Sequence, residues 1–114
     1  MQLFEFEGKQ LFKNCGINIP VGQLISGSVD QITTKTPLVL KAQTLSGKRA
    51  EGGGIVRIKN KELSIKEEVQ KLFGKTVNGE KVKKILVEEA VDIDKEYYLS
   101  FSYSTQTRGP VMTF

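Results

Sequence analysis

A basic, glycine-rich loop between two apolar segments is the part of this sequence best suited to chemistry. The loop holds Lys48 and Arg49, followed by three glycines at 52–54, and Lys41 stands at the end of the preceding apolar run. Lysine and arginine supply positive charge, and glycines let backbone N–H groups approach the oxygens of a ligand closely. This combination predicts a loop that binds polyphosphate.

The loop is not a Walker A motif. That motif has the form G-x-x-x-x-G-K-[ST] and opens a helix. Here Lys48 and Arg49 precede the glycines, and the alternating pattern of residues 54–59 after them predicts a strand. The phosphates would therefore be covered by a β-hairpin loop. The alternative is a surface hairpin whose glycines serve only its turn, and the motif alone does not separate the two.

Carboxylates after a predicted buried strand form a second candidate site. An apolar run at 85–87 leads to Glu88 and Glu89, and Glu96 comes eight residues after Glu88. In a nucleotide pocket, the backbone at a strand exit can contact the base edge, and a carboxylate accepts hydrogen bonds from ribose hydroxyls. Acidic residues after a strand also commonly form a solvated turn, so both interpretations stay open here.

Composition limits the kinds of site that the chain can build. Its 114 residues include no histidine and one cysteine. The sequence therefore lacks the residues needed for histidine-based acid–base catalysis, for a phosphohistidine and for a structural zinc site. Hydrophobic residues make up 39% and charged residues 26%, as in a soluble globular chain of one domain. The net charge of +4 is spread among interleaved acids, which argues against nucleic-acid binding.

The sequence also bears on the compartment. No apolar run approaches the roughly 18 residues of a membrane span, and the N-terminus lacks the layout of a secretory signal. We therefore expect a cytoplasmic protein without a membrane partner. Cys15 cannot form an internal disulfide and is expected to be a buried thiol on the apolar face of a helix.

Two helices are predicted to position these sites. Apolar spacing predicts the first over residues 3–15, with Gly8 on its packed face and Gly16 at its end. The second is predicted over 61–73, with Asn60 as its cap and Gly74 at its end. Four apolar residues of the second helix recur at i, i+4, i+7 and i+8: Ile65, Val69, Leu72 and Phe73.

The remaining segments predict strands and turns. Strands are expected at 21–26, 38–43, 54–59, 85–87, 97–104 and 111–114, a helical turn at 30–34, and a turn at Asn78-Gly79. Segments 38–43 and 54–59 should pair antiparallel across the glycine-rich loop. The sequence ends within an expected strand, so we expect a truncated domain over 1–114. The predicted fold is α+β, a mostly antiparallel sheet with two main helices.

Together these stretches resemble the N-terminal part of the β subunit of succinyl-CoA synthetase (succinate–CoA ligase), an ATP-grasp protein. The opening LFEFEGKQLFKNCGINIPVG is similar to the family's H-E-Y-Q-A-K-type start, followed by L-F and G-x-x-x-P-x-G. VLKAQTLSGKRAEGGGIVRIKN is similar to V-K-x-Q-x-x-x-G-x-R-G-K-A-G-G-V, and ILVEEAVDIDKEYYLSFSYS to I-L-V-E-x-x-x-D-I-x-K-E-x-Y-L. The similarity covers nearly all of the chain and implies the N-terminal portion of an ATP-grasp fold.

The resemblance implies nucleotide contacts for seven residues, which are Lys41, Lys48, Arg49, Ala50, Glu88, Val91 and Glu96. The first four would lie at the phosphates. Of these, Lys48, Arg49 and Ala50 occupy the family's Gly-Arg-Gly positions, and only Arg49 is the same residue as in the family. Glu88 would meet the adenine side, the Val91 backbone would contact the base edge, and Glu96 would bind ribose.

The resemblance also implies cofactors and partners. The nucleotide would be ATP or GTP, magnesium would be held by an Asn and an Asp beyond residue 114, and an α subunit would carry the phosphohistidine. The full enzyme would convert an acid, CoA and a nucleoside triphosphate to acyl-CoA, nucleoside diphosphate and phosphate, as in the tricarboxylic acid cycle. Relatives that use citrate or malate share the pattern.

The chain alone is expected to behave differently from that full enzyme. Residues 1–114 would form half of a nucleotide clamp, so we expect them to be inactive as a ligase and to self-associate. One alternative is a non-catalytic fragment that binds a nucleotide or a partner. A small basic nucleic-acid binder is the third hypothesis.

Overall fold

The computed structural model describes residues 1–27, 32–60 and 65–114. Within these ranges the helices are α1 (Glu5–Asn14) and α2 (Ile65–Phe73). The strands are β1 (Gly22–Ile25), β2 (Leu38–Ala42), β3 (Ile55–Ile58), β4 (Thr76–Val77), β5 (Glu80–Lys81), β6 (Ile85–Glu89), β7 (Ser100–Ser104) and β8 (Gly109–Thr113). The predicted α+β class, with mostly antiparallel strands, is confirmed.

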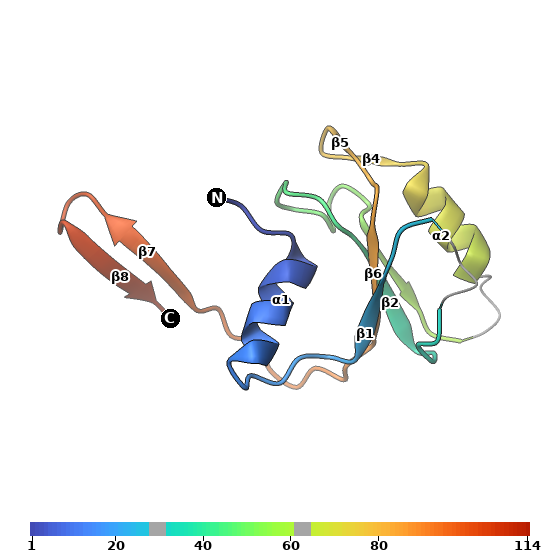
Figure 1. Cartoon of the computed structure of the whole chain (residues 1–114), viewed down its shortest axis with the longest axis horizontal. Coiled ribbons are helices and arrows are strands. Elements are labelled where there is room, and N and C mark those ends of the chain that lie inside the picture. The colour runs from blue at the N-terminus through green and yellow to red at the C-terminus, as the bar shows by residue number, and fades with distance from the viewer. Residues whose placement is uncertain (28–31, 61–64) are drawn as a thin grey trace.

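The main sheet has four strands in the order β1–β6–β2–β3 (Figure 1). β2 pairs antiparallel with β3, from Leu38 opposite Ile58 to Lys41 opposite Ile55, as the sequence predicts. β6 lies between β1 and β2 and is antiparallel to both. The loop that joins β2 to β3 forms turns and contains no regular helix. The predicted strand, loop and strand are thus all present.

The two faces of this sheet differ because successive side chains of a strand point to opposite sides. On one face, Leu40 and Val87 pack with Val69 and Leu72 of α2, and all four are fully buried. The other face carries Lys41 and is covered by α1, which lies across the sheet from α2 (Figure 1). The hydrophobic core therefore belongs to the α2 side, and the face with the candidate site belongs to the α1 side.

α2 follows its predicted pattern. Val69 and Leu72 are buried in the core, and Ile65 and Phe73 pack partly buried against it. The predicted first turn, residues 61–64, lies outside the described residues. The helix ends before Gly74, whose N–H donates to the carbonyl of Gln70 at 3.1 Å. Neither α2 nor any other helix of the described residues is long and apolar enough to cross a membrane.

α1 departs from its prediction. It is shorter than residues 3–15, and none of its residues is buried. Leu11 and Phe12 are each 53% exposed, and Cys15 is also exposed, so the prediction of a buried thiol is wrong. A Cβ on Gly8 would meet nothing within 4 Å, so Gly8 is not a close-packing site either. The reason is that charged side chains, described below, attach this helix to the sheet.

Three residues that the sequence predicts at a helix end or in a turn have the positive φ that such positions require. Gly16, with φ 82°, follows α1. Asn78 and Gly79, with φ 49° and 84°, connect β4 and β5, as expected for a two-residue hairpin. The helical turn predicted at 30–34 is absent at 32–34, and residues 30–31 lie outside the described ranges. The Gln23 side chain instead accepts a hydrogen bond from the Thr33 N–H at 2.6 Å.

β7 and β8 form a separate antiparallel hairpin that projects away from the sheet beyond α1 (Figure 1). It extends the molecule to 52 Å along its longest axis. The predicted strand over 97–104 begins only at Ser100, and the final strand starts earlier than predicted, at Gly109. β7 does not belong to the sheet that carries Lys41 and Glu88, because residues 90–99 lead the chain away from that sheet after β6.

Candidate functional site

Five charged side chains meet between α1 and the sheet, and we call them the charge cluster. Two are anions and three are cations: Glu5, Glu88, Lys9, Lys41 and Arg49. They come from α1, β2, the glycine-rich loop and β6, so four separate parts of the chain converge here. Their side chains are between 3% and 23% exposed, which shields the charges partly from water.

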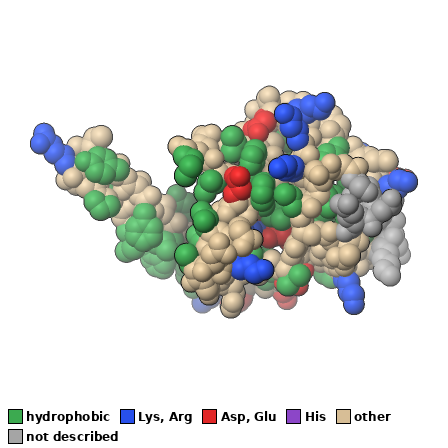
Figure 2. Space-filling view, viewed as in Figure 1, with side chains coloured by type: hydrophobic (Ala, Val, Ile, Leu, Met, Phe, Trp, Pro, Cys, Tyr) green, Lys and Arg blue, Asp and Glu red, His purple; other side chains and the backbone are tan. Residues whose placement is uncertain are grey.

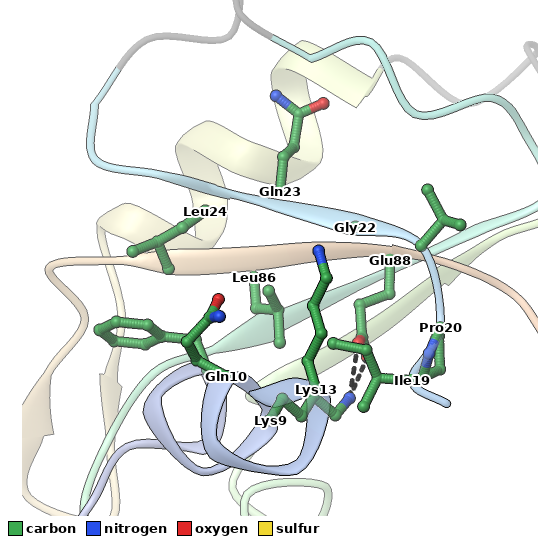
Figure 3. A pocket seen from close by; sticks show the side chains of 12 residues that line it. Lys9, Gln10, Lys13, Ile19, Pro20, Gly22, Gln23, Leu24, Leu86 and Glu88 are labelled. Carbon is green, nitrogen blue, oxygen red and sulfur yellow. Dashed lines mark hydrogen bonds and ion pairs between the residues drawn. The ribbon is translucent and has the colours of Figure 1, made fainter. Parts of the chain in front are cut away.

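Glu88 is the most buried member of the cluster. Its carboxylate lies 2.7 Å from the Lys41 Nζ and 2.5 Å from the Lys9 Nζ. Figure 3 shows the Lys9 ammonium reaching from α1 to this carboxylate. A buried carboxylate needs such partners because an unpaired charge in the interior is very unfavourable. Glu88 therefore fixes one cation of β2 and one of α1 at the same point.

Glu5 connects α1 to the glycine-rich loop. Its Oε1 lies 2.8 Å from the Lys9 Nζ and 3.1 Å from the Lys41 Nζ, and its Oε2 lies 2.5 Å from an Arg49 guanidinium nitrogen. The guanidinium also donates to the Ala42 carbonyl at 2.9 Å, at the end of β2. One carboxylate thus bridges Lys41 and Arg49, two of the three cations that the family resemblance assigns to the phosphates.

These contacts set the ionisation of two groups. Burial alone would raise the pKa of Glu5, but hydrogen bonds from Lys9 and Arg49 and the charge of Lys41 outweigh it and lower the pKa to about 2. Burial would lower the pKa of Lys41, but Glu88 and Glu5 outweigh it and raise that pKa. Both side chains are therefore charged at neutral pH, and their ion pair persists over a wide range of pH.

Acid should loosen α1 before it unfolds the core. The folded pKa of Glu5 is depressed to about 2 from 4.5, so its contribution is fully present above pH 4.5 and is lost as the pH falls towards 2. The loss should be on the order of 2 kcal/mol, once solvent screening at this partly exposed site is allowed for. A pH titration of amide chemical shifts should show α1 changing before α2.

The control for this titration is the Glu5→Gln variant, which has no carboxylate at the position. Its α1 signals should lack the transition that the wild-type chain shows between pH 4.5 and 2. Simultaneous loss of α1 and α2 signals in one transition, unchanged in the variant, would contradict the assignment of this linkage to Glu5.

An amide side chain completes the attachment of α1. Gln43, 3% exposed, accepts a hydrogen bond from the Phe6 N–H at 3.0 Å and donates to the Lys41 carbonyl at 3.0 Å. Our sequence interpretation missed Glu5, Lys9 and Gln43 as members of the site. A signal was present for two of them, because Glu5 and Lys9 are four residues apart and lie on one face of a helix.

Four of the predicted site residues surround one hollow of about 310 Å³, and these are Lys41, Glu88, Val91 and Glu96. Lys41 and Glu88 lie at its inner end, in the charge cluster. Val91 is 53% exposed and Glu96 is also exposed, so they form the rim. Residues predicted to contact the phosphates, the base and the ribose therefore line one surface.

The other three predicted residues line a neighbouring hollow of about 480 Å³, and these are Lys48, Arg49 and Ala50. Glu5 lines it too, and Ile55 lines both hollows, so they adjoin. Lys48 has φ 56°, a left-handed conformation that favours glycine. It stands at a position where the family that the sequence resembles has glycine.

The loop glycines are hydrogen-bonded within the loop itself. The N–H groups of Gly52, Gly53 and Gly54 donate to the carbonyls of Lys48, Ala50 and Arg49, at 3.2, 3.2 and 2.7 Å. These N–H groups are not directed at a ligand, contrary to the prediction that the glycines present them to phosphate. In this conformation, the side chains of the loop and of β2 supply the positive charge of the site.

Among the described residues, no group of three His, Cys, Asp or Glu side chains could hold a metal ion. The carboxylates of Glu5 and Glu88 are both engaged by cations. These residues therefore do not fit a magnesium site.

Comparison with known proteins places these features in a wider group. The model of the ATP-grasp domain family matches residues 2–114. The chain is 45% identical, over its whole length, to the succinate–CoA ligase [ADP-forming] subunit beta of Methanocaldococcus jannaschii, of which it covers 32%. It is 41% identical, over 95% of its length, to the same-named subunit of Staphylothermus marinus, of which it covers 29%.

A relative that is named for a different substrate is also similar. The ADP-forming sulfoacetate-CoA ligase subunit SauC of Bilophila wadsworthia is 41% identical over 90% of this chain, which covers 27% of that protein. The chain thus spans about a third of the length of the curated relatives that it matches.

Proposed function

We propose, given that this chain belongs to the ATP-grasp domain family, that it forms the nucleotide-binding part of an ADP-forming acyl-CoA ligase. The observation that carries the proposal is the convergence of Lys41 and Arg49 on one carboxylate. A carboxylate and a phosphate group both present paired anionic oxygens. Two cations that hold the first can therefore hold the second.

In this proposal, the nucleotide lies along the two adjoining hollows. Its phosphates contact Lys41 and Arg49, with Lys48 and Ala50 in the covering loop. Its base and ribose lie over Glu88 and at the rim formed by Val91 and Glu96. Lys41 and Arg49 would offset the negative charge of the phosphates as it redistributes during phosphoryl transfer.

The remaining parts of the reaction would be supplied from outside residues 1–114. We propose an α subunit that carries the phosphorylated histidine, because the similar relatives are named as beta subunits of a ligase. Magnesium ligands are likewise proposed elsewhere in the full-length protein. The chemistry of that protein would join an acid to CoA and release nucleoside diphosphate and phosphate.

The acid itself is proposed to be succinate, because two of the three relatives described above are named succinate–CoA ligase. The similarity to a subunit of a sulfoacetate–CoA ligase makes sulfoacetate the second candidate. Citrate and malate stay further alternatives. A non-catalytic fragment that binds a nucleotide or a partner is the alternative function.

The test is an assay of the full-length protein together with its α subunit. We expect ATP-dependent formation of an acyl-CoA, accompanied by ADP and phosphate, when the acids are supplied one at a time and the thioester is measured chromatographically. GTP in place of ATP tests the nucleotide preference. Residues 1–114 alone should give no thioester, because they lack the acid and CoA sites.

Two outcomes would contradict the proposal. The first is acyl-CoA formation by residues 1–114 alone. The second is a full-length protein that binds neither ATP nor GTP in calorimetry. Any weak binding by the isolated chain needs a competition with inorganic polyphosphate, because 17 basic side chains attract anions without specificity.

A further inference from the structure

α1 is attached to the sheet through polar contacts and not through an apolar interface. None of its residues is buried. A hollow of about 400 Å³ stays open between α1 and the strands β1 and β6. Figure 3 shows Lys9, Gln10 and Lys13 of α1 on one side of this hollow, with Leu24 and Leu86 of the sheet on the other.

Two of these polar contacts use the cations of the proposed phosphate site. Glu5 places one carboxylate oxygen near Lys41 and the other near Arg49. An arriving phosphate would need the same two cations. The hollow lined by Arg49 is also lined by Glu5, so a ligand that enters it meets the carboxylate directly.

We propose that Glu5 is an internal competitor for the phosphates, and that nucleotide binding displaces its carboxylate and loosens α1. This inference rests on the proposed function, because it concerns the same phosphate site. Once displaced, α1 would keep the ion pair of Lys9 with Glu88 and the hydrogen bond of Gln43. The helix would therefore shift or become more mobile without detaching completely.

The competition would also select among ligands. A singly charged anion that displaces Glu5 only substitutes one negative charge for another. It therefore gains little binding free energy. A triphosphate brings several negative charges to Lys41, Arg49 and Lys48, so it can outcompete Glu5. Glu5 would thus be a specificity-determining residue that favours polyphosphates over small monocarboxylates.

The direct test compares Glu5→Gln with wild type in the full-length protein, with ATP and inorganic tripolyphosphate as calorimetric probes. Removing the competitor should tighten the binding of both probes by about five- to tenfold. The matched control is Glu51→Gln, which removes the same charge close to the loop. Glu51 is exposed and makes no ion pair with any residue that the structure describes, so this variant should change affinity less than twofold.

A second measurement reports on the helix itself. Hydrogen exchange of the α1 amides should become faster when ATP is added to wild type, and should already be fast in Glu5→Gln without ATP. Exchange in α2 should not change, because the core lies on the other face of the sheet and contains no residue of α1. The α2 signals also verify that the variant is folded.

The outcomes separate this inference from the function on which it rests. Tighter binding by Glu5→Gln with faster α1 exchange on ATP binding supports it. Weaker or unchanged binding by Glu5→Gln, with wild type binding ATP normally, overturns it and leaves the nucleotide site intact, since Glu5 would then merely position the cations. Absence of tripolyphosphate and ATP binding by wild type would overturn both.

Discussion

In the full-length protein, replacing Arg49 by alanine should lower nucleotide-dependent turnover in the proposed ligase reaction by about ten- to a hundredfold. Losing one charge-assisted contact to a phosphate costs roughly 1.5–3 kcal/mol. Lys41→Ala should have an effect of similar size. The measurement is kcat/KM for ATP at saturating acid and CoA. An effect confined to the transition state lowers kcat, whereas uniform loss of nucleotide binding raises KM.

The control for this pair is Lys66→Ala. Lys66 lies on the exposed side of α2, across the sheet from the site, and its loss should leave turnover unchanged. Lys41→Ala also leaves the buried Glu88 with Lys9 as its one remaining cationic partner in the charge cluster. The melting temperature must therefore accompany the kinetics, and Arg49→Ala is the cleaner variant. Equal turnover by all three variants would refute the site assignment.

The parts of the fold that the sequence predicts well are those governed by local pattern. Alternating and continuous apolar runs identify β2, β3 and β6. The i, i+4, i+7 spacing identifies α2, because its apolar side faces the core. The basic loop between β2 and β3 is identified by the types of its residues. These features depend on neighbours along the chain or on a single buried face.

The features that the sequence does not predict depend on long-range charge pairing. α1 has an apolar stripe with Leu11, Phe12 and Cys15, yet these side chains are exposed. What attaches the helix is Glu5 and Lys9, whose partners Arg49 and Glu88 are distant in the chain. Helical periodicity cannot predict these ion pairs. It identifies the apolar side of a helix, but not the distant residues that its charged side chains contact.

The same limit applies to the last two strands. Their alternation predicts that they are strands, but it does not show with which strand each one pairs. β7 and β8 pair with each other, outside the main sheet.

The β7–β8 hairpin leads to the second large prediction, which is that the 114-residue chain self-associates. Its register places Phe101 opposite Met112 and Tyr103 opposite Pro110, so these four side chains share one face. Phe101, Tyr103 and Met112 are 72%, 70% and 61% exposed. Tyr97 stacks on Phe114 at the open end of the hairpin, with ring centroids 6.2 Å apart.

The opposite face of the hairpin is mostly polar, with Val111 as its apolar member. Ser100, Ser102 and Ser104 alternate with the aromatic residues of β7. A two-stranded hairpin is marginally stable in water, and one with an apolar face needs a second layer. Figure 2 shows the hydrophobic side chains gathered on this projecting part of the molecule. In a full-length protein, we expect further parts of the chain to supply that layer.

For residues 1–114 alone, we expect a second copy to supply the layer. A fully covered Phe or Tyr buries about 150–250 Å². Five aromatic side chains of the hairpin region are at least 70% exposed. Four of them lie on the apolar face or at its open end, and these are Tyr97, Phe101, Tyr103 and Phe114. They would contribute about 500 Å² of the roughly 800 Å² per partner that a standard interface buries, and Leu99 and Met112 add to this area.

Sedimentation velocity across a concentration series should therefore show a monomer at low concentration and a dimer at higher concentration. Phe101→Ser should shift the midpoint of association by about tenfold or more towards higher concentration, because it removes a large apolar side chain from the centre of the face. Ser102→Thr changes the other face of the same strand and should leave the midpoint unchanged. A wild-type chain that stays monomeric at millimolar concentration would show that the exposed aromatic face needs no partner. Equal shifts in the two variants would place the interface elsewhere, such as at the unpaired edges of β7 and β8.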